Sequence, residues 1–173
     1  SFEYRVIDAN LGTSNEGKVT IQVRELPKVL GDAVTTCQDI VLEGTLAVLV
    51  TAGTPPYSFE LVNQASHAQV TLNADGSFSI IPDEGFSGVT SFHYKVVDSV
   101  GTASLAASIT VTIHEAPVAR ETNYETSVSR AVTGDLSSLV TQGTPPYTFI
   151  LEAVDHAQVA LNPDGTFVYT PDA

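Results

Sequence analysis

Apolar and polar residues alternate at the start of the chain and again ten residues later. Side chains of a β-strand point to opposite faces in turn, so the alternation over residues 1–8 and 18–24 predicts two strands. Residues 9–17 between them are rich in Gly and Asn, which are typical of turns. We therefore predict a β-hairpin over residues 1–25, ended by Pro27. Its inward side chains are Phe2, Tyr4, Val6, Val19, Ile21 and Val23.

Further short strands are predicted along the rest of the chain, and no stretch has a convincing helical period. Residues 45–50 are apolar enough to be buried on both faces, whereas Tyr57, Phe59 and Leu61 alternate clearly with polar residues. About seven short strands at spacings of roughly 8 to 12 residues predict an all-β sandwich. The further predicted strands are 33–36, 45–50, 57–61, 70–72, 78–80, 91–98, 104–114 and 166–170.

The chain repeats itself. GTPPYSF at residues 53–59 returns 90 positions later as GTPPYTF at residues 143–149. HAQV and LNADGSF within residues 67–78 return 89 positions later as HAQV and LNPDGTF within residues 156–167. A period of this length fixes the repeating unit at the size of a small β-sandwich domain.

The chain also begins with the end of a repeat, because SFEYRVID at its start matches SFHYKVVD at residues 91–98. We therefore predict three parts. Residues 1–27 are the C-terminal hairpin of a preceding, split repeat, and residues 28–117 are a complete repeat. Residues 118–173 are the N-terminal part of a second repeat that lacks its last two strands. The pattern fits real chain termini and equally a window cut from a longer chain.

Three motifs resemble a known family. LNADGSF at residues 72–78, IPDEGFSG at residues 81–88 and SFHYKVVD at residues 91–98 are similar to the bacterial Ig-like and cadherin-like tandem repeats of large secreted adhesins and surface proteins. The sequence departs from that pattern at residues 89–90 and 99–101. The resemblance implies tandem immunoglobulin-like (cadherin-like) antiparallel β-sandwiches, a place at the cell surface or outside the cell, and work as stalk segments.

Charge narrows the partners. The chain carries 7 Lys and Arg against 20 Asp and Glu, a formal net charge of −13, which repels phosphate backbones, so we expect no nucleic-acid partner. No apolar run approaches about 18 residues, so we expect no membrane insertion in this segment. Cys37 is the only cysteine and is interpreted as a small, half-buried side chain.

The sequence predicts no enzyme, because no nucleophile stands with a base and no carboxylates are paired. Cadherin-like modules suggest calcium at the junctions, but six to eight oxygen ligands need clustered acids, and no such cluster is present. We interpret the junctional acids as solvated and expect no cofactor, with junctional Ca²⁺ as the alternative. His67 and His156 lie one repeat apart and are interpreted as structural. The junctional acids are Asp8, Glu25, Asp32, Asp98, Glu115 and Glu121.

We expect a non-enzymatic structural repeat protein of a microbial cell surface or extracellular fibre. The alternative is an adhesin module that binds a glycan or a host protein through loops at one pole of the sandwich. Exposed aromatic residues on those loops would favour the alternative, but only Phe86 and Tyr124 fall outside the inward parity. The inward aromatic residues are Phe2, Tyr4, Tyr57, Phe59, Phe78, Phe92 and Tyr94.

Two site predictions follow from the repeat. Tyr4 and Tyr94 are predicted to be buried at the start of the penultimate strand and to tie a loop through their hydroxyl groups, as a tyrosine corner does. The hairpin of residues 1–27 is predicted to complete the 118–173 domain of a neighbouring copy or of an adjacent repeat of the same protein. An isolated two-stranded hairpin is marginal in water, and an open sheet edge invites strand addition.

Overall fold

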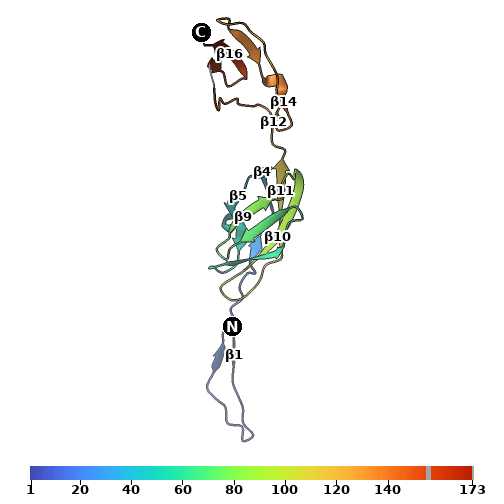
Figure 1. Cartoon of the computed structure of the whole chain (residues 1–173). Coiled ribbons are helices and arrows are strands. Elements are labelled where there is room, and N and C mark those ends of the chain that lie inside the picture. The colour runs from blue at the N-terminus through green and yellow to red at the C-terminus, as the bar shows by residue number, and fades with distance from the viewer. Residues whose placement is uncertain (155–156, 173) are drawn as a thin grey trace.

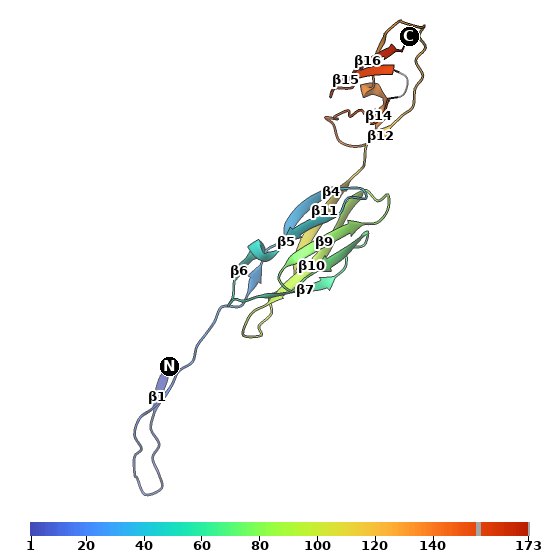
Figure 2. The same ribbon diagram turned by 60° about the vertical axis from the view of Figure 1, so that its left-hand side comes forward.

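The computed structural model describes residues 1–154 and 157–172. Three groups of strands follow one another along an elongated molecule (Figure 1). The hairpin of β1 (Phe2–Tyr4) and β2 (Gly17–Val19) lies at one end, and the strands from β12 onward lie at the other. Figure 2 shows the same order from another side, with a β-sandwich between the two ends.

The central sandwich consists of a four-stranded sheet and a three-stranded sheet. The larger sheet has the order β4-β11-β10-β7, so that β10 and β11 are its middle strands. Its pairs are antiparallel except that β4 runs parallel to β11. Its strands are β4 (Asp32–Cys37), β7 (Ser58–Asn63), β10 (Gly88–Val97) and β11 (Ala107–His114).

The smaller sheet has the order β5-β9-β8. Two further short strands, β3 and β6, form a separate pair. The sheet and the pair are both antiparallel. Together with the larger sheet they confirm the all-β prediction for this part of the chain. The strands are β3 (Lys28–Val29), β5 (Leu42–Thr45), β6 (Val50–Ala52), β8 (Ala68–Leu72) and β9 (Ser77–Pro82).

The core lies between the two sheets. Alternate residues of β10 and β11 point into it and are fully buried, as the period-two pattern of the sequence predicts. Residues of β7, β8 and β9 cover them from the other strands. The buried hydrophobic residues are Leu46, Phe59, Ala68, Val70, Phe78, Ile80, Phe92, Tyr94, Val96, Ile109, Val111 and Ile113.

One predicted strand is wrong. Residues 45–50 do not form a strand buried on both faces, because a 3₁₀ turn, η1 (Ala47–Leu49), separates β5 from β6. The turn places Leu46 in the core and leaves Val48 largely exposed. The apolar run is therefore divided between two strands rather than filling one.

The third group repeats only part of the sandwich. The sheet β13-β16-β15 corresponds to β5-β9-β8, and the pair of β12 with β14 corresponds to β3 with β6. The 3₁₀ turn η2 (Ser137–Leu139) corresponds to η1. The strands are β12 (Val118–Ala119), β13 (Val132–Asp135), β14 (Val140–Thr141), β15 (Ala157–Leu161) and β16 (Thr166–Pro171).

Candidate assembly site

The N-terminal hairpin has the backbone pairing of the β10–β11 hairpin. Phe2 pairs with Val19, and 90 positions later Phe92 pairs with Ile109. The next two pairs match at the same offset, and so does an isolated bridge beyond the strands. The part of the hairpin next to its turn therefore keeps its pairing without a surrounding domain, although β1 and β2 are shorter than β10 and β11.

The turn of the hairpin also keeps its side-chain hydrogen bonds. Asp8 Oδ1 accepts hydrogen bonds from the backbone amides two and four residues further on, and Asp98 does the same. The Ser14 hydroxyl accepts a hydrogen bond from the Val6 amide, as the Ser104 hydroxyl does from the amide of its own hairpin. Acidic residues predicted at the junctions thus hold turns in both hairpins.

The inward face of the N-terminal hairpin is bare. Phe2, Tyr4 and Val6 are 54%, 51% and 57% exposed, whereas their equivalents in β10 are 0% exposed. Ile21 and Val23 are also exposed, and Val19 is half-buried. All six residues predicted for assembly thus lie on the hairpin, and within the described chain no domain covers them.

The predicted burial of Tyr4 is wrong in this chain, because the sheet that should cover it is absent from the hairpin. Tyr94 is buried, and its hydroxyl donates a hydrogen bond of 2.8 Å to the Leu30 carbonyl oxygen. The geometry differs from a tyrosine corner: Tyr94 is the seventh residue of the ten in β10, and its acceptor lies 64 residues earlier. Burial, and secondly the charge of Asp32, raises the pKa of Tyr94 to about 12.

Within residues 118–154 and 157–172, the structure shows no counterpart of the four-stranded sheet. Residues 122–127 correspond to β4 and residues 148–153 correspond to β7, yet neither segment is a strand. The physical reason is that β4 and β7 hydrogen-bond only to β11 and β10, and no such middle strands are present here. Without a hydrogen-bonding partner an extended segment is not stabilised as a strand.

This part has no hydrophobic core of its own. None of its described hydrophobic residues, in 118–154 and 157–172, is buried. Positions that are buried in the central sandwich are only half-buried here, although the residues are apolar in both. The pairs are Leu46 with Leu136, Phe59 with Phe149, Phe78 with Phe167, and Ile80 with Tyr169.

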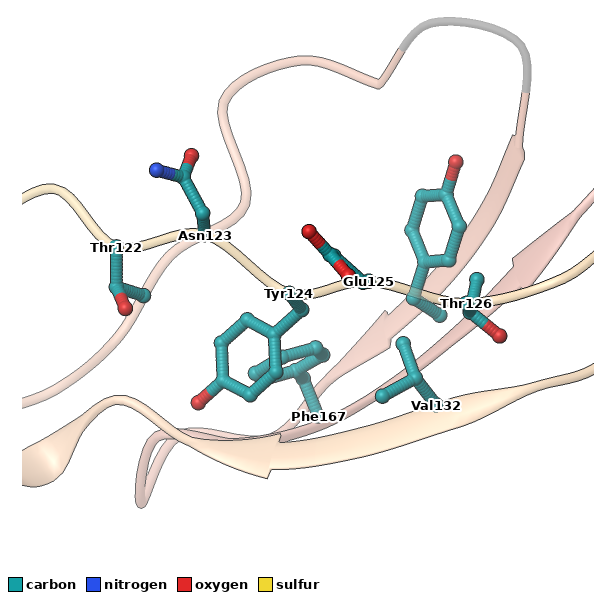
Figure 3. A pocket seen from close by; sticks show the side chains of 8 residues that line it. Thr122, Asn123, Tyr124, Glu125, Thr126, Val132 and Phe167 are labelled. Atoms are coloured by element: carbon teal, nitrogen blue, oxygen red, sulfur yellow. The ribbon is translucent and has the colours of Figure 1, made fainter.

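A hollow of about 680 Å³ lies between residues 122–126 and the side chains of Val132 in β13 and of Phe167 and Tyr169 in β16. Figure 3 shows the ring of Tyr124 beside that of Phe167. The two rings meet edge to face, with centroids 5.3 Å apart. Sequence reasoning noted Tyr124 only as an exception to the inward parity; its alignment with Val34 of β4 at offset 90 could have placed it at this site.

Other candidate chemistry stays dispersed. Among residues 1–154 and 157–172, no three His, Cys, Asp or Glu side chains form a group that could hold a metal ion. His67 stacks on Phe86 at a centroid distance of 4.2 Å and lies 3.8 Å from an Asp83 oxygen, whereas His156 falls outside the described residues. Cys37 is exposed, not half-buried as expected.

Two equivalent turns each contain an aspartate whose carboxyl pKa is lowered. The hydroxyl and backbone amide of Ser77 donate to Asp75 and lower the pKa of its carboxyl. The backbone amide and hydroxyl of Thr166 do the same to the pKa of Asp164. Both shifts arise from a local turn, so they indicate a repeated structural element and not a catalytic acid.

Sequence comparison identifies the repeat. The profile of the family described as Bacterial Ig domain matches residues 25–113, just over half of the chain and nearly all of the central sandwich. The chain belongs to the bacterial Ig domain family. Membership confirms the resemblance to Ig-like repeats and the predicted fold class. It also makes the central sandwich an Ig domain, whereas the match does not extend to residues 118–172.

Solved structures give distant likenesses. An endo-fucoidan hydrolase of glycoside hydrolase family 107 is 14% identical with a TM-score of 0.37, covering 99% of this chain and 29% of that one. A titin tandem fragment is 10% identical with a TM-score of 0.40, covering 86% and 57%. An intimin fragment is 16% identical with a TM-score of 0.33, covering 86% of both chains. This chain thus spans less than a third of the hydrolase and just over half of the titin fragment.

No curated protein matches the sequence. Within the described residues, the structure contains no helix that is both long enough and apolar enough to span a membrane.

Proposed function

We propose that the chain is a non-enzymatic structural protein of a bacterial surface or extracellular fibre, built from Ig domains that assemble head to tail. In this assembly the hairpin of residues 1–27 completes the 118–173 domain of a neighbouring copy or of an adjacent repeat. One observation carries the proposal: the hairpin has the pairing and turn of the β10–β11 hairpin but an exposed apolar face. The incomplete domain exposes the surface that such a face covers in the central domain.

The apolar area supports association. Burying apolar surface stabilises a complex by roughly 25 cal/mol per Å² before ordering costs are subtracted. Six hairpin side chains and the half-buried residues of the incomplete domain lose contact with water together when the two parts meet. Exposed apolar faces on both parts are typical of interaction surfaces in a soluble protein.

The arrangement of the chain favours contacts between neighbours. The hairpin and the incomplete domain lie at opposite ends of the molecule, with the central Ig domain between them (Figures 1 and 2). A contact between different surfaces of two copies is heterologous, so it propagates into a filament or closes into a ring. Short linkers between domains that bury their own cores would give such an array reach and stiffness.

Charge and family membership support the remaining parts of the proposal. A formal net charge of −13 disfavours nucleic acid as a partner and suits a protein that works in the extracellular medium. The Bacterial Ig domain match covers residues 25–113, which include nearly all of the central sandwich. Together these features support a mechanical role rather than a catalytic one.

Light scattering after gel filtration tests the proposal. We expect the chain to elute as concentration-dependent polymers that separate into a single species of 18.2 kDa in denaturant. Val6→Asp should abolish polymers, because residue 6 is exposed in the free hairpin and its equivalent Val96 is fully buried. Thr20→Asp, on the outward parity of the hairpin, is the matched control and should still polymerise. A compact monomer at all concentrations would contradict the proposal.

A further inference from the structure

The surface that receives the hairpin is a slot with two flanks and not a single sheet edge. In the central Ig domain, β10 and β11 are the middle strands, with β4 on one side and β7 on the other. In the incomplete domain the equivalents of both outer strands are present as residues 122–127 and 148–153, but they are irregular. Among the described residues, no strand is paired with either segment.

We propose that the hairpin of a second copy of this chain inserts into this slot as the two middle strands, and that both flanks become strands only when it does. The inference rests on the proposed function and adds to it the docking mode and the folding step. Edge addition would extend the sheet β13-β16-β15 at β13 or β15 and leave both flanks irregular.

The register of the central domain fixes the pairing on the first flank. β11 runs parallel to β4, with Val111 beside Val34. At an offset of 90, this places Ile21 of the hairpin beside Tyr124. The same offset already describes the pairing inside the hairpin without exception, so the transfer of register uses a relation that the structure shows twice.

The second flank pairs with the other strand of the hairpin. β10 runs antiparallel to β7, with Val96 opposite Phe59 and Lys95 opposite Glu60. The equivalents are Val6 opposite Phe149, which is half-buried, and Arg5 opposite Ile150, which is largely exposed. The ion pair of Lys95 with Glu60, 3.0 Å long, is absent from this pairing, and Arg5 instead binds Glu16 within the hairpin at 3.0 Å.

The slot already contains the groups for two contacts that the central domain makes with its own hairpin. The Arg120 amide donates to the Leu139 carbonyl, as the Leu30 amide does to the Leu49 carbonyl. This places the Arg120 carbonyl where Leu30 accepts the hydrogen bond of Tyr94, so the Tyr4 hydroxyl has an acceptor.

The second contact is aromatic. Phe78 packs against Phe92 in the central domain, with ring centroids 6.2 Å apart. Their equivalents are Phe167 of the slot and Phe2 of the hairpin. In the empty slot Tyr124 contacts Phe167 instead (Figure 3). Insertion of the hairpin would therefore bring Phe2 against the Phe167 ring, which the Tyr124 ring already contacts in the unassembled chain.

Disulfide crosslinking between single-cysteine chains tests the register. With Cys37→Ser as the background, one chain carries Arg5→Cys and the other Ile150→Cys, at positions whose equivalents, Lys95 and Glu60, touch. We expect this pair to give the main crosslinked dimer on a non-reducing gel. Thr148→Cys, two residues away on the same parity, is the matched control and should crosslink poorly. Gln158→Cys on the outer strand β15 reports edge addition.

Hydrogen exchange provides a second measurement on the full chain. We expect amide exchange in residues 122–127 and 148–153 to slow by about tenfold or more on assembly. Polymers that crosslink through position 158, or in which both flanks stay unprotected, overturn the slot but leave head-to-tail assembly standing. A chain that stays monomeric overturns both.

Discussion

Tyr94 and Tyr4 occupy the same position of the repeat and differ entirely in their surroundings. Tyr94 has no exposed surface and donates to the Leu30 carbonyl, whereas half of the Tyr4 surface is exposed. Sequence identity at a repeat position therefore defines which contact a residue can make, and the presence of the facing segment decides whether it is made.

Removing the Tyr94 hydroxyl should weaken the central domain. Tyr94→Phe deletes one buried hydrogen bond, and we expect the free energy of unfolding to fall by about 1 to 2 kcal/mol, measured by urea denaturation. Tyr4→Phe is the control at the same repeat position and should leave the central domain unchanged in the unassembled chain. Equal stability of the Tyr94→Phe variant and the parent would show that the hydrogen bond to Leu30 contributes nothing.

The stability of the central domain at alkaline pH should depend on Tyr94. The pKa of Tyr94 is raised from 10.0 to about 12 by burial and by Asp32. In this range the unfolded chain gives up the proton first, so the stability that Tyr94 contributes is complete below pH 10 and is lost as the pH rises toward 12. We expect the free energy of unfolding to decline less steeply over this interval in Tyr94→Phe than in the parent. Parallel declines would contradict the shifted pKa.

At the scale of elements, a strand needs both its pattern and a neighbour. β11 extends over eight residues between two neighbouring strands, whereas β2, its equivalent, extends over only three. Residues 20–25 of the hairpin keep the apolar alternation but have no regular structure. The apolar pattern is thus sufficient to predict the strand and insufficient to form it without a partner.

Substitutions at one pair of equivalent positions should distinguish the buried core of the central domain from the exposed face of the hairpin. Ile113 is 2% exposed and Val23 is 90% exposed, although both stand at the same place in the repeat. Ile113→Ala should lower the free energy of unfolding of the central domain by about 2–5 kcal/mol, because it leaves a cavity in the core. Val23→Ala should leave that domain unchanged while it weakens polymers in light scattering. Comparable losses of domain stability in both variants would argue against a bare hairpin face.

The whole molecule combines the exposed apolar face of the N-terminal hairpin with a formal net charge of −13. Copies that meet head to tail bring like charges together, and this repulsion acts over the screening length of the solution. That length is about 30 Å at 0.01 M salt and about 8 Å at 0.15 M. Assembly should therefore depend on ionic strength in a definite direction.

Salt should promote assembly. We expect the mean polymer mass, measured by light scattering at a fixed protein concentration, to increase as NaCl rises from about 0.01 M to 0.15 M. The Val6→Asp variant serves as the control and should stay monomeric throughout. Polymers that dissolve as salt is added would indicate that ion pairs, and not apolar contacts, hold the copies together.

The sequence by itself determined the all-β fold and the period of about 90 residues. It could do so because alternation and turn residues are local signals, and because a repeat exposes equivalent positions to direct comparison. His67, Phe78 and Asp98, for example, were matched to their repeat equivalents by alignment of the sequence with itself. The family resemblance followed from the same short motifs.

Only the tertiary structure decided which strands lie in the middle of the sheet and which parts are left uncovered. Strand order depends on contacts between residues far apart in sequence, such as the parallel pairing of β4 with β11, and no local pattern encodes it. The order explains why residues 122–127 and 148–153 are irregular despite strand-like equivalents. Tyr94 is buried because a second sheet packs against its strand, and Tyr4 is exposed because, within the described chain, no sheet packs against the hairpin.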